Sequence, residues 1–475
     1  MKKLGFSTFL LLLTACTCLF SFACRNDRND YGDQHNIPVR MAAFAETEEF
    51  EPALSLRTGL DNPYYLVPNH GNQGYYYVEA KAVASSAMRT TKRLPLNLSL
   101  VIDQSGSMAG EKLVYAKQAA KHVIDQLSPE DYVSIVTYGT TVEVLATSNK
   151  VGDKTVLRNR IDAIQSIGST NLSGGMMEGY AQVKSTFHSG YVNRVLMLSD
   201  GQANVGITDI ATLQNIARNQ VNQNNITIST FGIGLDFNEN LMTSISEFGS
   251  GNYYFIHHPS EITGIFQKEL SGLTNVVAQN TELQITLPAG VALQRVFGYP
   301  YVQNGQQITV QLRDVFAGET KGVLLKFQVN ANQFAHQFHA QVRYTDVLTP
   351  DLRARTHTAS DVLTQTASIE QMGKSFNPTV KSQVVLFESN DNLEQAMRAV
   401  DSGQYEQARA LVKANDSYLN DNIGYVKQSS ELQTQMSNNA SYQTQITNVE
   451  ALSSQDIQLL QKSNKATNYE VRRKR

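Results

Sequence analysis

The stretch Leu94-Pro-Leu-Asn-Leu-Ser-Leu-Val-Ile-Asp103 decides the fold of this chain, because it has the apolar density of a buried strand and ends in a carboxylate. Helical spacing of apolar residues follows it from Glu111 to Leu127. Further strand and helix patterns alternate up to about residue 272: Tyr132 to Tyr138, Leu172 to Phe187, Arg194 to Ser199, Asp209 to Gln223 and Ile226 to Ile233. This alternation predicts an α/β domain over residues 94–273, with a mostly parallel central sheet and helices on both faces.

Period-two alternation replaces the helical spacing over residues 274–368. Leu283, Ile285 and Leu287 alternate with polar neighbours, and three similar runs follow, separated by Gly and Asn. The upstream stretch Tyr76 to Ala84 alternates in the same way. Because the downstream strands alone would leave an open sheet edge, we expect residues 50–93 and 274–368 to form one discontinuous antiparallel β-sandwich, into which the α/β domain is inserted.

Helical spacing returns over residues 370–475 and predicts a C-terminal helical region. The pattern around Gly403 resembles a single tetratricopeptide-like hairpin, and an ordinary helical hairpin explains it as well. Residues 427–462 are rich in Gln, Asn and Ser, which predicts a weak helix or a partly disordered tail. The basic end, Arg472 to Arg475, predicts a solvated terminus.

The first 24 residues predict an export signal. Two lysines precede an uncharged stretch from Leu4 to Ala23, and Cys24 follows small residues at the −3 and −1 positions. A Cys in that place resembles the lipidated Cys of a bacterial lipobox; Cys16, after Leu-Thr-Ala, is the alternative, and an uncleaved membrane anchor is a third reading. Residues 25–49 read as a polar tether. We therefore expect a membrane-anchored lipoprotein of the bacterial cell envelope, facing the periplasm or the cell surface.

Composition excludes several classes of function. The chain of 475 residues has 40 Lys and Arg against 43 Asp and Glu, so it lacks the global basic field expected of a nucleic-acid-binding protein. All three cysteines lie within the first 24 residues, which excludes thiolate metal sites and a Cys nucleophile from the body. No Gly-x-x-x-x-Gly-Lys phosphate loop exists, so nucleotide binding is not expected. Ser107 lacks a Gly-x-Ser-x-Gly elbow, and we expect no enzyme.

Five oxygen-bearing side chains follow the carboxyl ends of the predicted strands: Asp103, Ser105, Ser107, Thr170 and Asp200. Because these strand ends lie along one edge of a parallel sheet, the five side chains are expected to converge. Two carboxylates and three hydroxyls, without His or Cys, suit Mg²⁺, and also Mn²⁺ or Ca²⁺. Hydroxyls neutralise no charge, so a bound cation would keep an open position for an acidic group of a partner.

The series Asp-x-Ser-x-Ser, a later Thr and a later Asp-Gly resembles the metal-ion-dependent adhesion site of von Willebrand factor type A (VWA) domains. The sequences of residues 107–113, 168–174 and 198–204 resemble those of bacterial surface lipoproteins. These lipoproteins are related to inter-alpha-trypsin inhibitor heavy chains and to calcium-activated chloride channel-like proteins. The resemblance implies a Rossmann-like fold in which the five residues form the metal shell, with both serines as direct ligands and the acids able to act through water.

The function that this resemblance implies is non-catalytic adhesion. A lipid-anchored protein of this kind would bind an Asp or Glu side chain of a protein partner through the metal. The alternative is a scaffold or accessory subunit of an envelope assembly, in which the metal site is structural.

Overall fold

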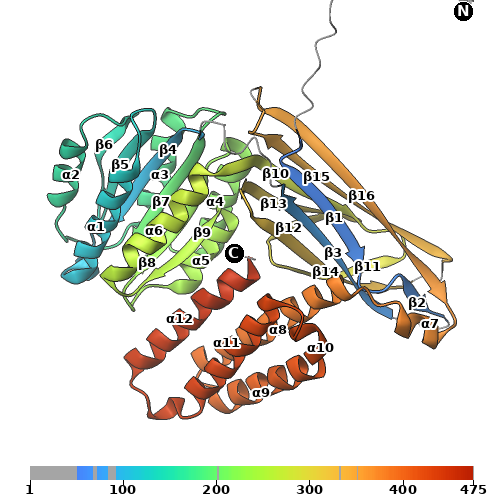
Figure 1. Ribbon diagram of the computed structural model, residues 1–475. Helices are drawn as coiled ribbons and strands as arrows, with labels where there is room; N and C mark the ends of the chain where they lie inside the picture. The colour runs from blue at the N-terminus through green and yellow to red at the C-terminus, as the bar shows by residue number, and fades with distance from the viewer. Residues whose placement is uncertain are drawn as a thin grey trace, which may run out of the picture. The chain divides into compact units, whose positions relative to one another are not determined.

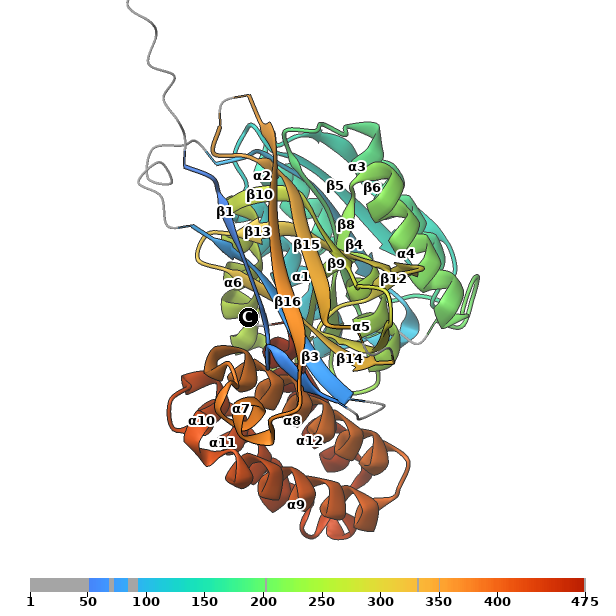
Figure 2. The same ribbon diagram turned by 90° about the vertical axis from the view of Figure 1, so that its right-hand side faces the viewer.

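The computed structural model describes residues 51–67, 72–83, 93–200, 203–330, 333–349 and 351–473. Figure 1 and Figure 2 show how their helices and strands are arranged. The expectations for residues 1–49, including lipidation at Cys24 or Cys16, lie outside this part of the chain. Within it, no helix combines the length and the apolar composition needed to cross a bilayer.

The α/β domain is built on one mixed sheet. Its strands are β4 (Leu96–Asp103), β5 (Tyr132–Tyr138), β6 (Val142–Lys150), β7 (Val192–Ser199), β8 (Thr227–Ile233) and β9 (Ser250–Ile256). They lie in the order β6-β5-β4-β7-β8-β9, and all neighbours are parallel except β5 and β6. The sheet therefore has the expected parallel centre, with one antiparallel edge strand.

Helices cover both faces of this sheet: α1 (Glu111–Gln126), α2 (Lys154–Asp162), α3 (Leu172–Ser185), α4 (Ile210–Asn224), α5 (Glu239–Phe248) and α6 (Pro259–Thr274). Every residue of β4 is buried. Leu98 and Ile102 join a core with α1 and α6, whereas Val101 joins a second core with α3, α4 and α5. Alternate side chains of a strand point to opposite faces, which is why a strand buried on both sides reads as an unbroken apolar run.

The β-sandwich combines two distant segments of the chain. Its strands are β1 (Leu54–Leu60), β2 (Tyr64–Leu66), β3 (Asn72–Ala82), β10 (Val276–Thr286), β11 (Val291–Phe297), β12 (Tyr301–Asn304), β13 (Gln307–Phe316), β14 (Thr320–Val329), β15 (Ala335–Asp346) and β16 (Arg353–Thr366). One sheet has the order β1-β3-β14-β11 and the other β12-β13-β10-β15-β16-β2. One apolar core lies between them. Because β3 pairs with both β1 and β14, the sequence of the α/β domain interrupts that of the sandwich.

A buried arginine joins the two domains. Arg194 on β7 is 1% exposed, and its guanidinium donates to Glu269 of α6 at 2.9 Å and to Asp314 of β13 at 3.2 Å. Its Nε also donates to the Thr227 hydroxyl at 2.8 Å. Burial raises the pKa of Asp314, and the positive charge of Arg194 opposes that shift. The ion pair thus compensates acidic groups that would otherwise be costly to bury.

The C-terminal region consists of helices joined by short connections: α7 (Ile369–Lys374), α8 (Pro378–Asp401), α9 (Tyr405–Asp421), α10 (Ile423–Val426), α11 (Ser430–Ile446) and α12 (Ser454–Arg472). Of the two alternatives predicted for residues 427–462, the helix is found in α11 and in the first part of α12, and the partly disordered tail is wrong. Buried amides explain the difference: Asn415 donates to Asn439 at 2.9 Å, and Asn390 donates to Asn468 at 2.7 Å. These Asn side chains occupy core positions because they are hydrogen-bonded to one another across helices.

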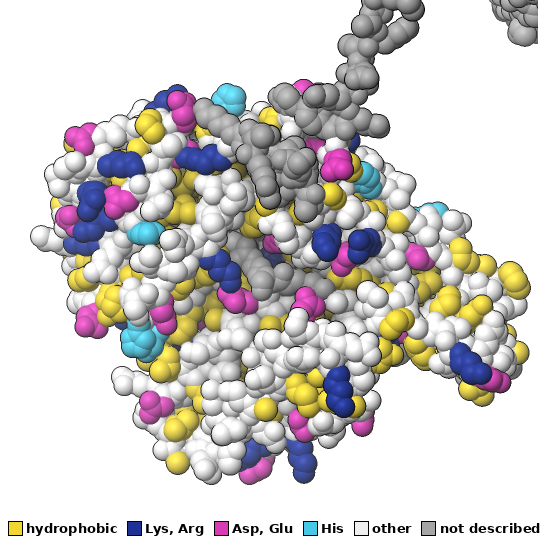
Figure 3. All heavy atoms as spheres, viewed as in Figure 1, with side chains coloured by type: hydrophobic (Ala, Val, Ile, Leu, Met, Phe, Trp, Pro, Cys, Tyr) yellow, Lys and Arg dark blue, Asp and Glu magenta, His cyan; other side chains and the backbone are white. Residues whose placement is uncertain are grey.

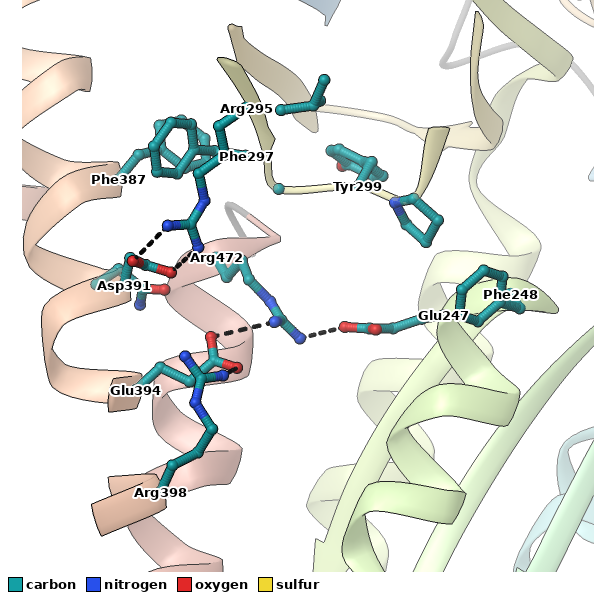
Figure 4. Close-up of a pocket in the computed structure, with 14 residues that line it drawn as sticks. Glu247, Phe248, Arg295, Phe297, Tyr299, Phe387, Asp391, Glu394, Arg398 and Arg472 are labelled. Carbon is teal, nitrogen blue, oxygen red and sulfur yellow. Dashed lines mark hydrogen bonds and ion pairs between the residues drawn. The ribbon is translucent and has the colours of Figure 1, made fainter. Parts of the chain in front are cut away.

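The prediction of a solvated terminus is wrong for Arg472 and Arg473, whereas Lys474 and Arg475 lie outside the described residues. Arg472 of α12 forms ion pairs with Glu247 of α5 and with Glu394 of α8, the latter at 3.3 Å, and Figure 4 shows its guanidinium between the two carboxylates. Arg473 is 8% exposed and its guanidinium carbon lies 4.5 Å from the centre of the Tyr299 ring. The end of α12 is therefore part of the fold, because its charges meet acidic and aromatic groups of other elements.

Lys462 of α12 is a buried cation with a testable titration. Its ammonium donates to the carbonyl oxygen of Phe237 at 2.8 Å, and burial lowers its pKa to about 8 although Glu239 opposes the shift. Between about pH 8 and pH 10 the unfolded chain binds the proton more firmly than the folded one, so this residue's contribution to stability rises over that range. We expect the Cε signal of Lys462 to titrate near pH 8 in ¹³C NMR, assigned with Lys462→Arg. A midpoint above pH 10, as for surface lysines, would contradict this.

Candidate metal centre

Three loops meet at the carboxyl edge of the α/β sheet. Asp103 ends β4, Asp200 directly follows β7, and Thr170 lies just before α3. The amide of Gly106 donates to the carbonyl of Gly168 at 2.9 Å, which fixes the first loop against the loop that carries Thr170. The edge is the one at which parallel α/β sheets place their ligands.

Four of the five predicted side chains are linked by short contacts. The hydroxyl oxygens of Ser105 and Ser107 are 3.1 Å apart, and the Ser107 hydroxyl donates to Oδ1 of Asp200 at 2.9 Å. Asp103 accepts the amide of Ser105 at 2.9 Å through Oδ1 and the hydroxyl of Ser199 at 2.8 Å through Oδ2. Neighbouring ligands in an octahedron of about 2.1 Å radius lie about 3 Å apart, so the spacing of the Ser105, Ser107 and Asp200 oxygens fits part of a Mg²⁺ shell.

The two carboxylates are buried, whereas the mouth of the site is open. Asp103 and Asp200 are at most 2% exposed, and Ser107 is exposed to solvent. Burial raises the pKa of Asp103, hydrogen bonds from Ser105 and Ser199 oppose the shift, and the charge of Asp200 adds to it. A divalent cation would offset the cost of burying the charge of Asp103 beside Asp200.

Thr170 is positioned through its backbone. It is 3% exposed, its amide donates to Oδ1 of Asn204 at 2.8 Å, and its carbonyl accepts the amides of Asn204 and Val205, both at 3.2 Å. The fifth predicted residue thus lies in the loop beside the other four, and Asn204 ties that loop to the one that follows Asp200. The described residues contain no cluster of three or more His, Cys, Asp or Glu suited to a metal, so hydroxyls would complete any cation site here.

Residues 97–268 match the family profile described as von Willebrand factor type A domain. These residues form a VWA domain. The predicted fold class is confirmed: the VWA domain has a sheet with parallel strands flanked by helices, and further sheets and C-terminal helices accompany it.

Two relatives match this chain over part of their own length. The chain is 31% identical over 277 residues to uncharacterized protein YfbK of Escherichia coli, an alignment that covers 57% of this chain and 47% of YfbK. It is 26% identical over 246 residues to inter-alpha-trypsin inhibitor heavy chain H3 of Rattus norvegicus, covering 48% of this chain and 27% of that protein. The matches thus span about half or less of these relatives.

Two solved structures share the fold beyond the VWA domain. A von Willebrand factor type A protein from Catenulispora acidiphila has a TM-score of 0.64 at 15% identity, covering 81% of this chain and 90% of its own. The ArnB paralog VWA2 from Sulfolobus acidocaldarius has a TM-score of 0.60 at 16% identity, covering 88% and 99%. At such low identity the likeness concerns the fold alone.

Sequence reasoning missed the residues that support the site of the VWA domain. Lys112 in the first turn of α1 donates to Oδ2 of Asp200 at 2.8 Å, while Ser199 and Asn204 make the contacts described above. Lys112 lies five residues after Ser107, and a search for oxygen ligands of a metal does not select a lysine. Ser199 gave a usable signal, since it ends the apolar strand that leads into Asp200.

The Gly168 turn offers a test of the loop geometry. Gly168 has a φ of +81°, and a Cβ there would lie 2.4 Å from the hydroxyl oxygen of Thr140. Strain of this kind costs about 1–3 kcal/mol, so Gly168→Ala is expected to displace the loop and weaken Mg²⁺ binding about tenfold in calorimetry. Gly152→Ala is the matched control, because a Cβ at Gly152 meets no atom within 4 Å. Equal affinities in the two variants would contradict the expected role of this loop.

Proposed function

We propose that this protein is an exported, lipid-anchored binding protein that holds an acidic group of a protein partner through a divalent metal at the VWA domain. The metal ligands would be Asp103, Ser105, Ser107, Thr170 and Asp200, with Mg²⁺ as the resident ion and Mn²⁺ or Ca²⁺ as alternatives. One observation carries the proposal: the 3.1 Å and 2.9 Å spacings that join the oxygens of Ser105, Ser107 and Asp200 around an open mouth.

The proposed ligands have two roles: some supply negative charge, and others lie where a partner can reach the metal. Asp103 and Asp200 supply the negative charge from buried positions, and the hydrogen bonds to Asp103 hold its carboxylate in place. Ser107 is exposed, so a partner's Asp or Glu would approach on its side. A divalent ion bound there would act as the bridge between the two proteins, since two carboxylates leave it with coordination positions to share.

A non-catalytic role agrees with the surroundings of the site. Among the described contacts, the hydroxyl of Ser107 meets Ser105 and Asp200, and no histidine activates it. On the face drawn in Figure 3, Lys and Arg side chains are interspersed with Asp and Glu, which favours a protein partner over nucleic acid. We therefore place adhesion ahead of catalysis.

Capture from membrane extract tests this function. The immobilised full-length protein is expected to retain a partner in millimolar Mg²⁺ and to release it in chelator, and Asp103→Asn is expected to behave like the chelated wild type. A partner retained equally in Mg²⁺ and in chelator would instead support the alternative, a scaffold or accessory subunit of an envelope assembly with a structural metal site.

The anchor is tested separately. Cys24→Ser is expected to abolish labelling by a fatty-acid analogue and to release protein from the membrane fraction, because the thiol is the site of lipid attachment. Cys16→Ser is the matched variant and is expected to change neither readout. Labelling that survives Cys24→Ser but is lost in Cys16→Ser would assign the lipid to Cys16.

A further inference from the structure

Lys112 links the candidate metal centre to a neighbouring loop. Its ammonium lies 2.8 Å from Oδ2 of Asp200 and 2.7 Å from Oδ2 of Asp236. The Asp200 side chain is fully buried, whereas that of Asp236 is 68% exposed. One cation is thus shared between a proposed metal ligand and a solvent-exposed residue of the loop between β8 and α5.

The loop at residues 234–238 holds the stem of Lys112 in place. Gly234 has a φ of +76°, and a Cβ there would lie 2.9 Å from Cε of Lys112. The lysine stem therefore lies directly against the backbone of the loop, which no other residue type at position 234 would permit without a shift. A movement of the loop would move the ammonium as well.

Helix α12 contacts the loop at residues 234–238 through Phe237. Phe237 is 3% exposed, and its carbonyl oxygen accepts the ammonium of Lys462 at 2.8 Å. The same ammonium lies 3.6 Å from the centre of the Phe237 ring. One residue beyond the loop, Glu239 forms an ion pair with Lys465 of α12 at 3.2 Å. Figure 1 shows α12 beside α5, the helix that this loop leads into.

These contacts form an unbroken series from Asp200 through Lys112, Asp236 and Phe237 to Lys462. We propose that α12 is a latch that sets the metal affinity of the VWA domain: while it grips the loop, Lys112 stays on Asp200 as an internal cation and competes with the divalent ion. The inference rests on the proposed metal-binding function, and it adds a regulatory role for the C-terminal helices.

Charge determines the direction of the effect. A divalent ion and an ammonium that both contact one carboxylate repel each other, so a bound metal pushes Lys112 toward Asp236. The stem of Lys112 lies against Gly234 of the loop, so shifting the ammonium away from Asp200 moves the stem against the loop, and the hydrogen bond from Lys462 to Phe237 resists that movement. Releasing the latch is therefore expected to raise metal affinity. By thermodynamic linkage, metal binding is expected to loosen the contact between α12 and the loop.

Calorimetry on the full chain tests the latch. Lys112→Met is expected to raise the affinity for Mg²⁺ about tenfold by removing the competing cation, and Lys462→Met about fivefold by releasing the loop. The matched control is Lys268→Met, which also removes a lysine that pairs with α12, at Glu470 and 2.6 Å, but which leaves residues 234–238 untouched. The control is expected to bind Mg²⁺ like the wild type.

Hydrogen exchange on the unmodified protein gives a readout that does not depend on any variant folding. Saturating Mg²⁺ is expected to speed exchange at the amides of residues 234–238 and in α12, and to leave α9 unchanged. Wild-type protein that binds Mg²⁺, with Lys462→Met at wild-type affinity and no change in exchange, would overturn the latch alone. Wild-type protein that binds no divalent ion would overturn the proposed function, and the latch with it.

Discussion

Replacing Asp103 with Asn is expected to lower the affinity for Mg²⁺ by about a hundredfold or more and to leave the fold intact. A unit charge about 4 Å from another is worth about 4 kcal/mol at a partly buried site, and each 1.4 kcal/mol is a factor of ten. Asn keeps an oxygen to accept the Ser105 amide, and its amide group can donate to the Ser199 hydroxyl. The variant thus removes the charge with little change of shape.

Stability in chelator gives the second half of this test. Burial raises the pKa of Asp103, so its charged form is unfavourable in the metal-free fold, and Asp103→Asn is expected to have an equal or higher melting temperature there. In Mg²⁺ the order is expected to reverse, because only the wild type gains stability from binding. Asp153→Asn is the control: Asp153 caps α2, and Asn serves equally well as a cap. Mg²⁺ affinity in Asp103→Asn equal to that of the control would remove Asp103 from the site.

Arg194→Met is expected to give the largest loss of stability. It removes the buried cation that contacts both Glu269 and Asp314, and removing one member of a buried ion pair costs about 3–5 kcal/mol. In a domain of this size each kcal/mol shifts the melting temperature by about 2–4 °C, so a fall of about 6–20 °C is expected by calorimetry.

Two further variants test whether the loss of stability in Arg194→Met comes from acidic charges that are buried without their cation. Arg158→Met breaks an exposed ion pair with Asp125 and is expected to cost no more than about 1 kcal/mol. Glu269→Gln added to Arg194→Met is expected to recover part of the loss, because it removes one stranded charge. Similar melting temperatures for Arg194→Met and Arg158→Met would show that the buried pair does not hold the two domains together.

Sequence patterns predicted the parts of the fold in which local spacing and burial agree. The apolar run that ends at Asp103 could be read as a strand because both its faces are covered, and its position gave the edge at which the site residues gather. The edge strand β6 has a mixed pattern of burial, since one of its edges pairs with no other strand, and its residues therefore show no clear strand pattern. Periodicity is informative only where the environment of a strand or helix repeats.

The C-terminal helices show the other limit of such reading. In α11 and α12 polar residues occupy the buried positions, among them Asn439 and Asn468, so an apolar stripe does not reveal the helix face. Their partners come from other helices, and no local pattern reveals such pairings. Lys112 was missed for the same reason, because its meaning depends on Asp236, which lies 124 positions further along the chain.

The pairing of β3 with β14 has a consequence for biosynthesis. Val78 lies opposite Val323, so one strand must wait for a partner that is made 245 residues later. At about 5–20 residues per second the wait is roughly 12 to 50 seconds, long enough for the intervening VWA domain to fold first. During that time the β1–β3 hairpin is only marginally stable, and an unpaired strand edge invites pairing with other chains. A cell that makes this protein would therefore gain from a chaperone that covers the early hairpin until β14 arrives.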